Sequence, residues 1–185
     1  IMSLNLKEKM QTGLSQDVLN ALELCSKAAY EYGFKIYLIG GVVRDLLLEK
    51  EIFDIDVTVE GNATDFCHKL ADKKICKILQ VQNDLKTVKA CFKNNIEIDF
   101  ASTRQEFYPR RGHLPVVVRI GCTLEEDIYR RDFTINSLAI SLNKKNFGEI
   151  IDYVSGIDDL KNKTLKVLHD NSFNAVSYTH LTLPT

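Results

Sequence analysis

Two stretches of the 185-residue chain combine residue types that suit nucleotide and metal binding. In the first, an apolar run ends at Gly40-Gly41 and Arg44 follows, while the second contains Asp54 and Asp56. Glycines let the backbone approach a ligand closely, and a helix N-terminus offers unpaired N–H groups to an anion, so Arg44 would face the same phosphates. Carboxylates two residues apart on a strand project from one face and can hold a divalent cation. The pattern predicts a phosphate-binding turn beside a metal site.

Each of these signals also has an ordinary structural explanation. A D-x-D pair such as Asp54 and Asp56 is common on solvated strand faces, and a glycine pair alone is usually a turn. Their combination at short spacing, with Arg44 one turn into the predicted helix, favours the functional interpretation.

The elements that must position these residues follow from apolar periodicity. Residues 14–32 have apolar side chains at helical spacing, with Ser15 as the N-cap and Gly33 as the C-cap. Alternation over 54–59 places the two carboxylates on one face of a strand and apolar residues on the other. Further helices are predicted over 42–48, around 66–71 and from 123, and further strands over 36–39, 75–81, 86–92, 96–101, 138–142 and 149–153.

A third carboxylate is predicted close to the same site. Lys93-Asn94-Asn95 is a turn sequence that would join the strand over 86–92 to the strand over 96–101 as a hairpin. Asp99 lies on the polar face of the second strand and is therefore available beside the other two carboxylates.

Two later regions supply cationic side chains. The stretch over 105–115, which contains Arg110, is polar and basic with Gly and Pro, and it predicts a mobile loop that contacts substrate. Thr123-Leu124-Glu125-Glu126 fits a capping box, so a helix begins there and carries Arg130 and Arg131 at its end.

These stretches together resemble the head domain of class II tRNA nucleotidyltransferases, the CCA-adding enzymes, and of the related bacterial poly(A) polymerases. The resemblance runs from about Leu14 to Phe173. It is carried by Gly40-Gly41-x-x-Arg44-Asp45, Asp54-x-Asp56, Ile98-Asp99-Phe100-Ala101-Ser102-Thr103-Arg104, Leu124-Glu125-Glu126-Asp127 and Arg130-Arg131-Asp132-Phe133-Thr134-Ile135-Asn136.

The resemblance implies a role for each matching residue. Asp54 and Asp56 would be catalytic and hold two Mg²⁺ ions, and Asp99 would complete the site at the attacking hydroxyl. The implied nucleotide-binding residues are Gly40, Gly41, Arg44, Arg131, Asp132 and Asn136, and the candidates for contact with substrate are Arg104, Arg110 and Arg130.

The arginines also have structural alternatives. Arg130 and Arg131 can each offset the helix dipole and pair with Glu125 or Asp127. Arg104 can reach substrate or pair with Glu106, and the residues alone leave both roles open.

The resemblance further implies template-independent transfer of AMP and/or CMP from ATP or CTP to the 3′ end of RNA, above all tRNA, with release of pyrophosphate. Two alternatives remain at this point: poly(A) polymerase activity on other RNA, and a truncated nucleotide-binding module without turnover. The implied fold is α/β (α+β), a mixed sheet of about five strands with flanking helices. A head domain would span residues 1–153 and the start of a helical neck 154–173.

Residues 174–185 break the pattern of the family. The neck motifs Asp-Pro-x-Arg and Glu-Asp-x-x-Arg do not follow Phe173, and no helical period continues. We therefore expect this tail to be foreign or frame-shifted sequence, and the chain to be a truncated fragment.

Bulk properties narrow the class of protein. A 45% hydrophobic content supports a real core, and a net charge of −1 gives no overall basic field, so RNA would have to be held by a local patch or by further parts. Five scattered cysteines without C-x-x-C spacing argue against a disulfide framework and a zinc site. No apolar run approaches membrane-spanning length, and a cytoplasmic protein is expected.

Overall fold

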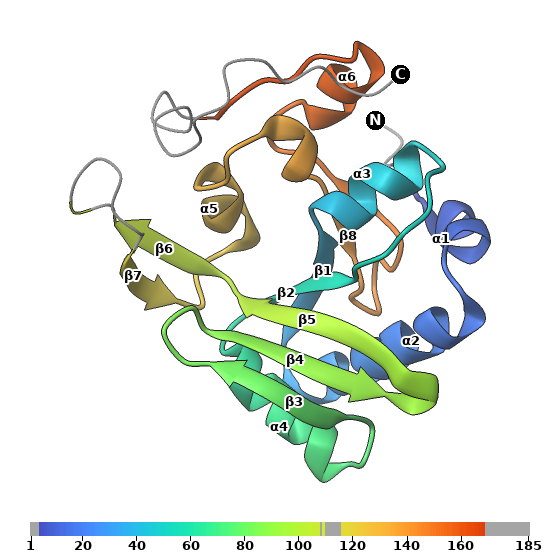
Figure 1. The fold of residues 1–185 in the computed structure, drawn as a ribbon, viewed down its shortest axis with the longest axis vertical. Helices are drawn as coiled ribbons and strands as arrows, with labels where there is room; N and C mark the ends of the chain where they lie inside the picture. Colours follow the sequence, from blue (N-terminus) through green and yellow to red (C-terminus); the bar gives the residue numbers. More distant parts are fainter. Residues whose placement is uncertain (1–3, 108, 110–115, 169–185) are drawn as a thin grey trace.

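A seven-stranded mixed sheet forms the centre of the computed structural model, which describes residues 4–107, 109 and 116–168 (Figure 1). The strand order is β3-β4-β5-β2-β1-β8-β9, with β2 parallel to β5 and antiparallel to β1. The mixed α/β fold is confirmed, with more strands than the expected five. The strands are β1 (Lys35–Ile39), β2 (Asp56–Glu60), β3 (Lys77–Gln82), β4 (Thr87–Phe92), β5 (Ile96–Ser102), β8 (Ala139–Ser141) and β9 (Ile150–Ile151).

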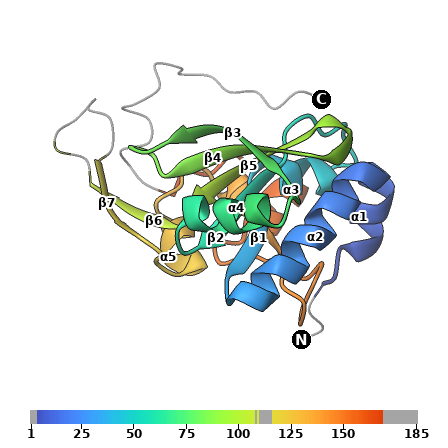
Figure 2. The same ribbon diagram turned by 90° about the horizontal axis from the view of Figure 1, so that it is seen from below.

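Helices cover the sheet on one face, where α2 and α4 lie side by side (Figure 2). The predicted caps of α2 are confirmed: the Ser15 hydroxyl accepts a hydrogen bond from the Val18 N–H, and Gly33 has a φ of 76°. The helices are α1 (Lys7–Gly13), α2 (Gln16–Tyr32), α3 (Gly41–Leu47), α4 (Ala63–Asp72), α5 (Leu124–Tyr129) and α6 (Gly156–Lys161), and the 3₁₀ turns are η1 (Lys93–Asn95) and η2 (Thr134–Asn136).

The core lies between this helical layer and the sheet. Phe66 of α4 packs edge-on against Phe100 of β5, with ring centroids 5.9 Å apart, and both side chains are fully buried. Ile98 points the same way as Phe100, so the intervening Asp99 points to the opposite face of the sheet. Apolar burial on one face therefore fixes a polar, half-exposed row on the other.

Strand β2 begins two residues later than predicted, at Asp56, so Asp54 is not part of it. The register with β1 pairs Leu38 with Val57, and continuing it would place Asp54 opposite Gly41, where α3 has already begun. Asp54 consequently has no strand partner on that side. The two carboxylates lie close in sequence, but one is in a strand and the other in the segment that enters it.

The prediction of a loop over 105–115 is wrong for its first residues. Strand β6 (Arg104–Phe107) pairs with β7 (Val116–Ile120) as a separate two-stranded ribbon, which projects beside α5 (Figure 1). Strand β6 shows no apolar alternation in the sequence, because its Arg104 and Gln105 side chains bond carboxylates rather than pack in an apolar core. Arg110 lies outside the described residues.

The segment after residue 153 packs on the same body as the rest of the chain. The Thr134 hydroxyl donates to the Asp159 carboxylate at 2.7 Å, Phe133 pairs with Val167 in a β-bridge, and Leu160 is buried. The division into a head and the start of a neck at 153/154 stays a prediction. Residues 174–185 lie outside the described part of the chain.

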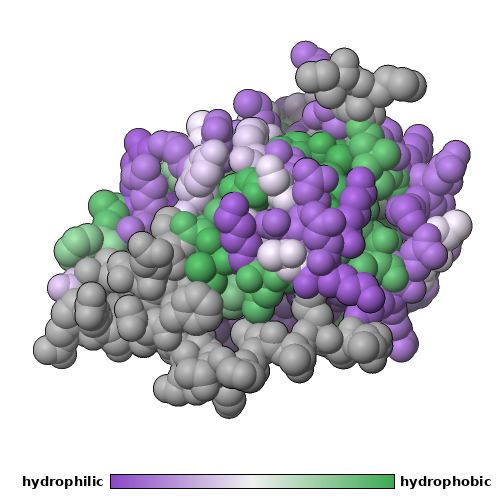
Figure 3. All heavy atoms as spheres, turned by 90° about the horizontal axis from the view of Figure 1, so that it is seen from above, coloured by the Kyte–Doolittle hydropathy of each residue, from purple (hydrophilic) through white to green (hydrophobic). Residues whose placement is uncertain are grey.

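On the face drawn in Figure 3, hydropathy does not single out a partner-binding region among the described residues. Hydrophilic and hydrophobic residues are interspersed on the described part of the face in Figure 3. Among the described residues, no helix has the length and apolar character needed to cross a membrane.

Gly156→Ala tests the docking of α6. A Cβ at this position would collide with the Thr134 carbonyl oxygen and lie 3.1 Å from a Leu138 methyl group. We expect urea denaturation to give a free energy of unfolding lower by about 1–3 kcal/mol. Lys161→Ala, on the exposed side of the same helix, should change it by less than about 0.5 kcal/mol. Equal stability of the two variants would contradict tight packing of α6.

Candidate active site

Two of the three predicted carboxylates lie directly beside each other. Asp56 on β2 and Asp99 on β5 are register partners in the parallel pair, and Asp54 is exposed just before β2. Partial burial raises the pKa of Asp56, and the neighbouring charges of Asp99 and Asp54 raise it further. Arg131 and Lys89 lower it, but by less. The site thus holds more negative charge than its own cations neutralise.

Lys89 is a member of this site that the sequence analysis missed. It lies opposite Asp99 in the β4–β5 hairpin, and its ammonium nitrogen is 3.1 Å from the Asp99 carboxylate and 3.6 Å from that of Glu97. The hydrogen bond from Lys89 to Asp99 is the main cause of the raised pKa of Lys89. The predicted turn over 93–95 already implied this register, so the hairpin was a signal that could have identified Lys89.

The glycine pair forms the predicted turn between β1 and α3. Gly40 has a φ of 80°, a conformation that favours glycine, and a Cβ there would lie 3.7 Å from the Asn136 carbonyl oxygen and 3.9 Å from an Arg131 guanidinium nitrogen. A Cβ at Gly41 would lie 3.5 Å from the guanidinium of Arg44. The turn therefore brings five of the six predicted nucleotide-binding residues within reach of one another.

Arg44 connects α3 to the η2 turn. Its guanidinium donates to Asp45 through Nε at 2.8 Å and Nη2 at 3.1 Å, and to the Asn136 side chain through Nη1 at 2.8 Å. These bonds use three of the five N–H groups of the guanidinium. The side-chain oxygen of Asn136, an implied nucleotide-binding residue, thereby accepts a hydrogen bond from Arg44 and joins η2 to α3.

Helix α5 begins with the predicted capping box. The Thr123 hydroxyl accepts from the Glu126 N–H, and the Glu126 carboxylate accepts from the Thr123 N–H at 2.8 Å. The helix ends with Arg130 and Arg131 beside the fully buried Asp127, whose carboxylate accepts from Arg130 Nε at 2.9 Å and Arg131 Nη2 at 3.2 Å. The ion pairs predicted as the alternative role of both arginines are therefore present.

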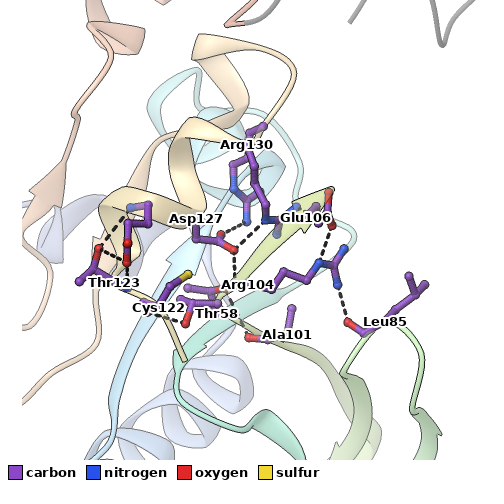
Figure 4. A network of polar contacts seen from close by, with 12 residues as sticks. Thr58, Leu85, Ala101, Arg104, Glu106, Cys122, Thr123, Asp127 and Arg130 are labelled. Atoms are coloured by element: carbon purple, nitrogen blue, oxygen red, sulfur yellow. Dashed lines mark hydrogen bonds and ion pairs between the residues drawn. The ribbon is translucent and has the colours of Figure 1, made fainter. Parts of the chain in front are cut away.

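Arg104 and Arg130 also share a second buried carboxylate, that of Glu106 (Figure 4). The distances to its Oε1 are 2.6 Å from Arg104 Nε and 3.2 Å from Arg130 Nη1. Arg104 also donates to the Leu85 carbonyl oxygen. The pairing of Arg104 with Glu106, one of its two predicted roles, is therefore present.

A pocket of about 430 Å³ opens where these groups meet. Asp132, which is exposed, forms part of its wall, so its side chain lies at the pocket without a structural role in the core. Arg131, one of the arginines of this wall, also lowers the pKa of Asp56 through its positive charge. The lining residues are Arg104, Glu106, Arg130, Arg131, Asp132, Phe133 and Asn136.

The guanidinium of Arg131 is only partly satisfied. Its Nε is buried and has no hydrogen-bond partner, and burial lowers the pKa of Arg131 while Asp127 raises it. A buried N–H donor without a partner at the edge of a pocket suits an anionic ligand. Within residues 4–107, 109 and 116–168, no three His, Cys, Asp or Glu side chains come together as a metal-binding cluster.

The comparison with known sequences identifies the family. The family described as "Poly A polymerase head domain" matches residues 36–166, which contain the glycine turn, the three carboxylates and the arginine pair. The chain belongs to this family. The resemblance inferred from the sequence motifs is confirmed.

Relatives of this head domain include two kinds of tRNA nucleotidyltransferase. The A-adding tRNA nucleotidyltransferase of Geobacter sulfurreducens is 41% identical over 164 residues, which cover 89% of this chain and 18% of that protein. The CCA-adding enzyme of Bacillus pumilus is 34% identical over 141 residues, covering 76% of this chain and 33% of that enzyme. The chain thus spans a third or less of either relative.

Solved structures have the same fold. An apo form of a CCA-adding enzyme matches with a TM-score of 0.82 and 34% identity over 95% of this chain and 41% of that one. A CCA-adding enzyme in complex with ATP matches with a TM-score of 0.77 over 94% of this chain and 38% of that one. The head-domain fold is therefore shared along nearly the whole chain.

Asp56→Asn is expected to stabilise the metal-free protein. Because the pKa of Asp56 is raised in the folded state, its charge lowers stability at neutral pH, and this cost disappears as the pH falls and the folded protein takes up the proton. In EDTA at pH 7, Tm should rise by a few degrees, at roughly 2–4 °C per kcal/mol, and the gain should shrink toward pH 4.

Asp84→Asn makes the same charge change at an exposed position in the turn between β3 and β4 and serves as the control. A Tm of Asp56→Asn at or below that of the wild type at pH 7 would contradict the electrostatic account of this site.

Proposed function

We propose that this head domain belongs to a tRNA nucleotidyltransferase that transfers AMP and/or CMP from ATP or CTP to the 3′ end of tRNA and releases pyrophosphate. The observation that carries the proposal is that a carboxylate pair and an arginine lie close together next to the glycine turn. The carboxylate Asp56, beside Asp99, and the guanidinium Arg131, beside the glycine turn, are close enough to shift each other's pKa. The relatives named above, and a solved CCA-adding enzyme of Thermotoga maritima complexed with tRNA, support tRNA as the acceptor.

The residues of the glycine turn and the arginines would bind the triphosphate. Arg131 has a buried Nε without a partner at the pocket, and Arg44 retains two N–H groups beyond its bonds to Asp45 and Asn136. The absence of a side chain at Gly40 leaves room for phosphate oxygens between these guanidinium groups. Forked, permanently charged guanidinium groups suit the charge on a phosphoryl group during transfer.

Asp54 and Asp56 fit a magnesium site. Magnesium is usually held by one or two carboxylates together with substrate phosphates, so the lack of a three-residue cluster among the described residues agrees with this mode of binding. Burial and the neighbouring charges of Asp99 and Asp54 raise the pKa of Asp56, and a divalent cation would offset both by stabilising the charged carboxylate. When bound, a pair of Mg²⁺ ions would activate the attacking hydroxyl and stabilise the leaving pyrophosphate.

Asp99 would act on the RNA side of the reaction. One of its carboxylate oxygens accepts from Lys89, and the other has no assigned partner among the described residues. That second oxygen can accept a hydrogen bond from the 3′-hydroxyl of the acceptor and orient it toward the nucleotide. Arg104 and Arg130 support the pocket wall through Glu106, and a substrate contact for Arg110 stays a prediction from the sequence.

Asp54→Asn and Asp56→Asn are each expected to lower nucleotide incorporation by roughly 10³-fold or more, because several kcal/mol of transition-state stabilisation would be lost. Transfer is measured with radiolabelled ATP and CTP on tRNA that lacks its 3′ nucleotides, with Asp84→Asn as the control.

Substantial Mg²⁺-dependent transfer by either variant would rule out the two-carboxylate assignment. Long adenylate tails on unstructured RNA by the wild type would point instead to poly(A) polymerase activity, and ATP binding without transfer would point to a nucleotide-binding module.

Arg44→Ala is expected to weaken ATP binding by about tenfold, the size of a charge-assisted hydrogen bond to phosphate. Isothermal titration calorimetry with Mg²⁺ and ATP measures the affinity, and circular dichroism checks the fold. Arg119→Ala, an exposed arginine of β7, is the matched control. An affinity equal to that of the control would remove Arg44 from the triphosphate site.

A further inference from the structure

We propose that Asp127 is a positioning residue that sets the direction of Arg131 for triphosphate binding. The inference rests on the proposed function and deepens it, because it names a residue that would not itself touch the nucleotide. The buried carboxylate of Asp127 binds groups on two backbone segments, the start of β6 and the end of α5.

Asp127 is 0% exposed, and both of its carboxylate oxygens accept hydrogen bonds. Oδ1 accepts from the Arg104 backbone N–H at 3.0 Å and from Arg130 Nε at 2.9 Å, and Oδ2 accepts from Arg131 Nη2 at 3.2 Å. A buried carboxylate with three donors is fixed in orientation, since each rotation would leave a donor unpaired. Asp127 can therefore fix the direction of an arginine side chain bonded to it.

Arg131 depends on this contact. Its guanidinium makes its one assigned hydrogen bond within the described part of the chain to Asp127, while its Nε has no partner. Arg130 follows the opposite pattern, because it is held by both Asp127 and Glu106. Of the two neighbouring arginines, Arg131 is therefore the one whose direction Asp127 alone determines and whose remaining donors are available to a ligand.

The balance of charge supports the same assignment. Three arginines, Arg104, Arg130 and Arg131, face the two buried carboxylates of Glu106 and Asp127, so one positive charge remains unmatched. Arg104 and Arg130 each bond Glu106, which is 4% exposed. The unmatched charge is consequently on Arg131, at the wall of the pocket and in the field of Asp56.

Asp127 also ties the arginine to the strand that carries the third carboxylate. The Arg104 N–H that it accepts lies at the start of β6, two residues after β5 ends at Ser102. One side chain thereby fixes Arg131 relative to the strand of Asp99. This bond fixes the position of the Arg131 guanidinium relative to Asp99, which contact of Arg131 with a phosphate alone would not do.

Asp127→Asn tests the proposal, because it keeps the shape and the oxygen that accepts from Arg104 and Arg130 but turns an N–H₂ group toward Arg131 Nη2. We expect ATP affinity, measured by calorimetry with Mg²⁺, to fall at least tenfold, with AMP affinity changed less than threefold. Glu125→Gln removes an exposed carboxylate from the same helix and should leave both affinities unchanged.

A double-mutant cycle separates positioning from a general structural effect. If Asp127 acts through Arg131, Asp127→Asn causes no further loss of ATP affinity in an Arg131→Ala background. Equal losses in both backgrounds, or equal losses for ATP and AMP, would overturn the proposal. Thermal denaturation of each variant confirms that the compared proteins are folded.

A nucleotide-free crystal structure of Asp127→Asn provides a readout that does not depend on the proposed function. The Arg131 guanidinium should leave its position beside residue 127, and an unchanged guanidinium would overturn the inference. If the wild type binds no ATP, the proposed function fails, while displacement of Arg131 in this crystal structure still supports control of its direction by Asp127.

Discussion

The parallel pairing of β2 with β5 is the constraint on which the rest of this head domain depends. It places the carboxylates of Asp56 and Asp99 side by side on one face of the sheet. Parallel neighbours require a crossover connection, and here the chain between them forms α4 and the strands β3 and β4. Helix α4 covers the apolar face and β4 brings Lys89 to the charged face, so the same connection that allows the pairing also supplies one of its counter-charges.

A second set of charges balances the arginines beside this face. Buried charges are tolerated when they are paired and hydrogen-bonded, and Asp127 and Glu106 meet that condition with Arg104 and Arg130. Arg131 remains incompletely paired, with an unsatisfied buried Nε. Asp56 likewise has a raised pKa, first because it is partly buried and then because its negative neighbours outweigh its positive ones. Incomplete compensation at both places is typical of a site that binds a charged ligand rather than of a purely structural ion network.

Local patterns in the sequence were sufficient for many of these features. The caps of α2, the capping box of α5, the β4–β5 hairpin and the alternation that exposes Asp99 all follow from residues within a few positions of one another. The late start of β2 and the strand β6 were not predictable in this way. The first depends on where α3 begins beside it. The second contains polar residues that bond distant groups, as the Arg104 N–H does with Asp127, twenty-three positions away.

By itself, therefore, the sequence determined the mixed α/β fold, the family, and the residue types of the candidate site, because spacing along a helix or strand sets which side chains share a face. Only the tertiary structure decided which of those side chains meet. The contacts of Arg44 with Asn136, of Asp56 with Asp99 and of Arg104 with Asp127 join segments distant in the chain. Their geometry results from packing and charge balance, and no local spacing contains that information.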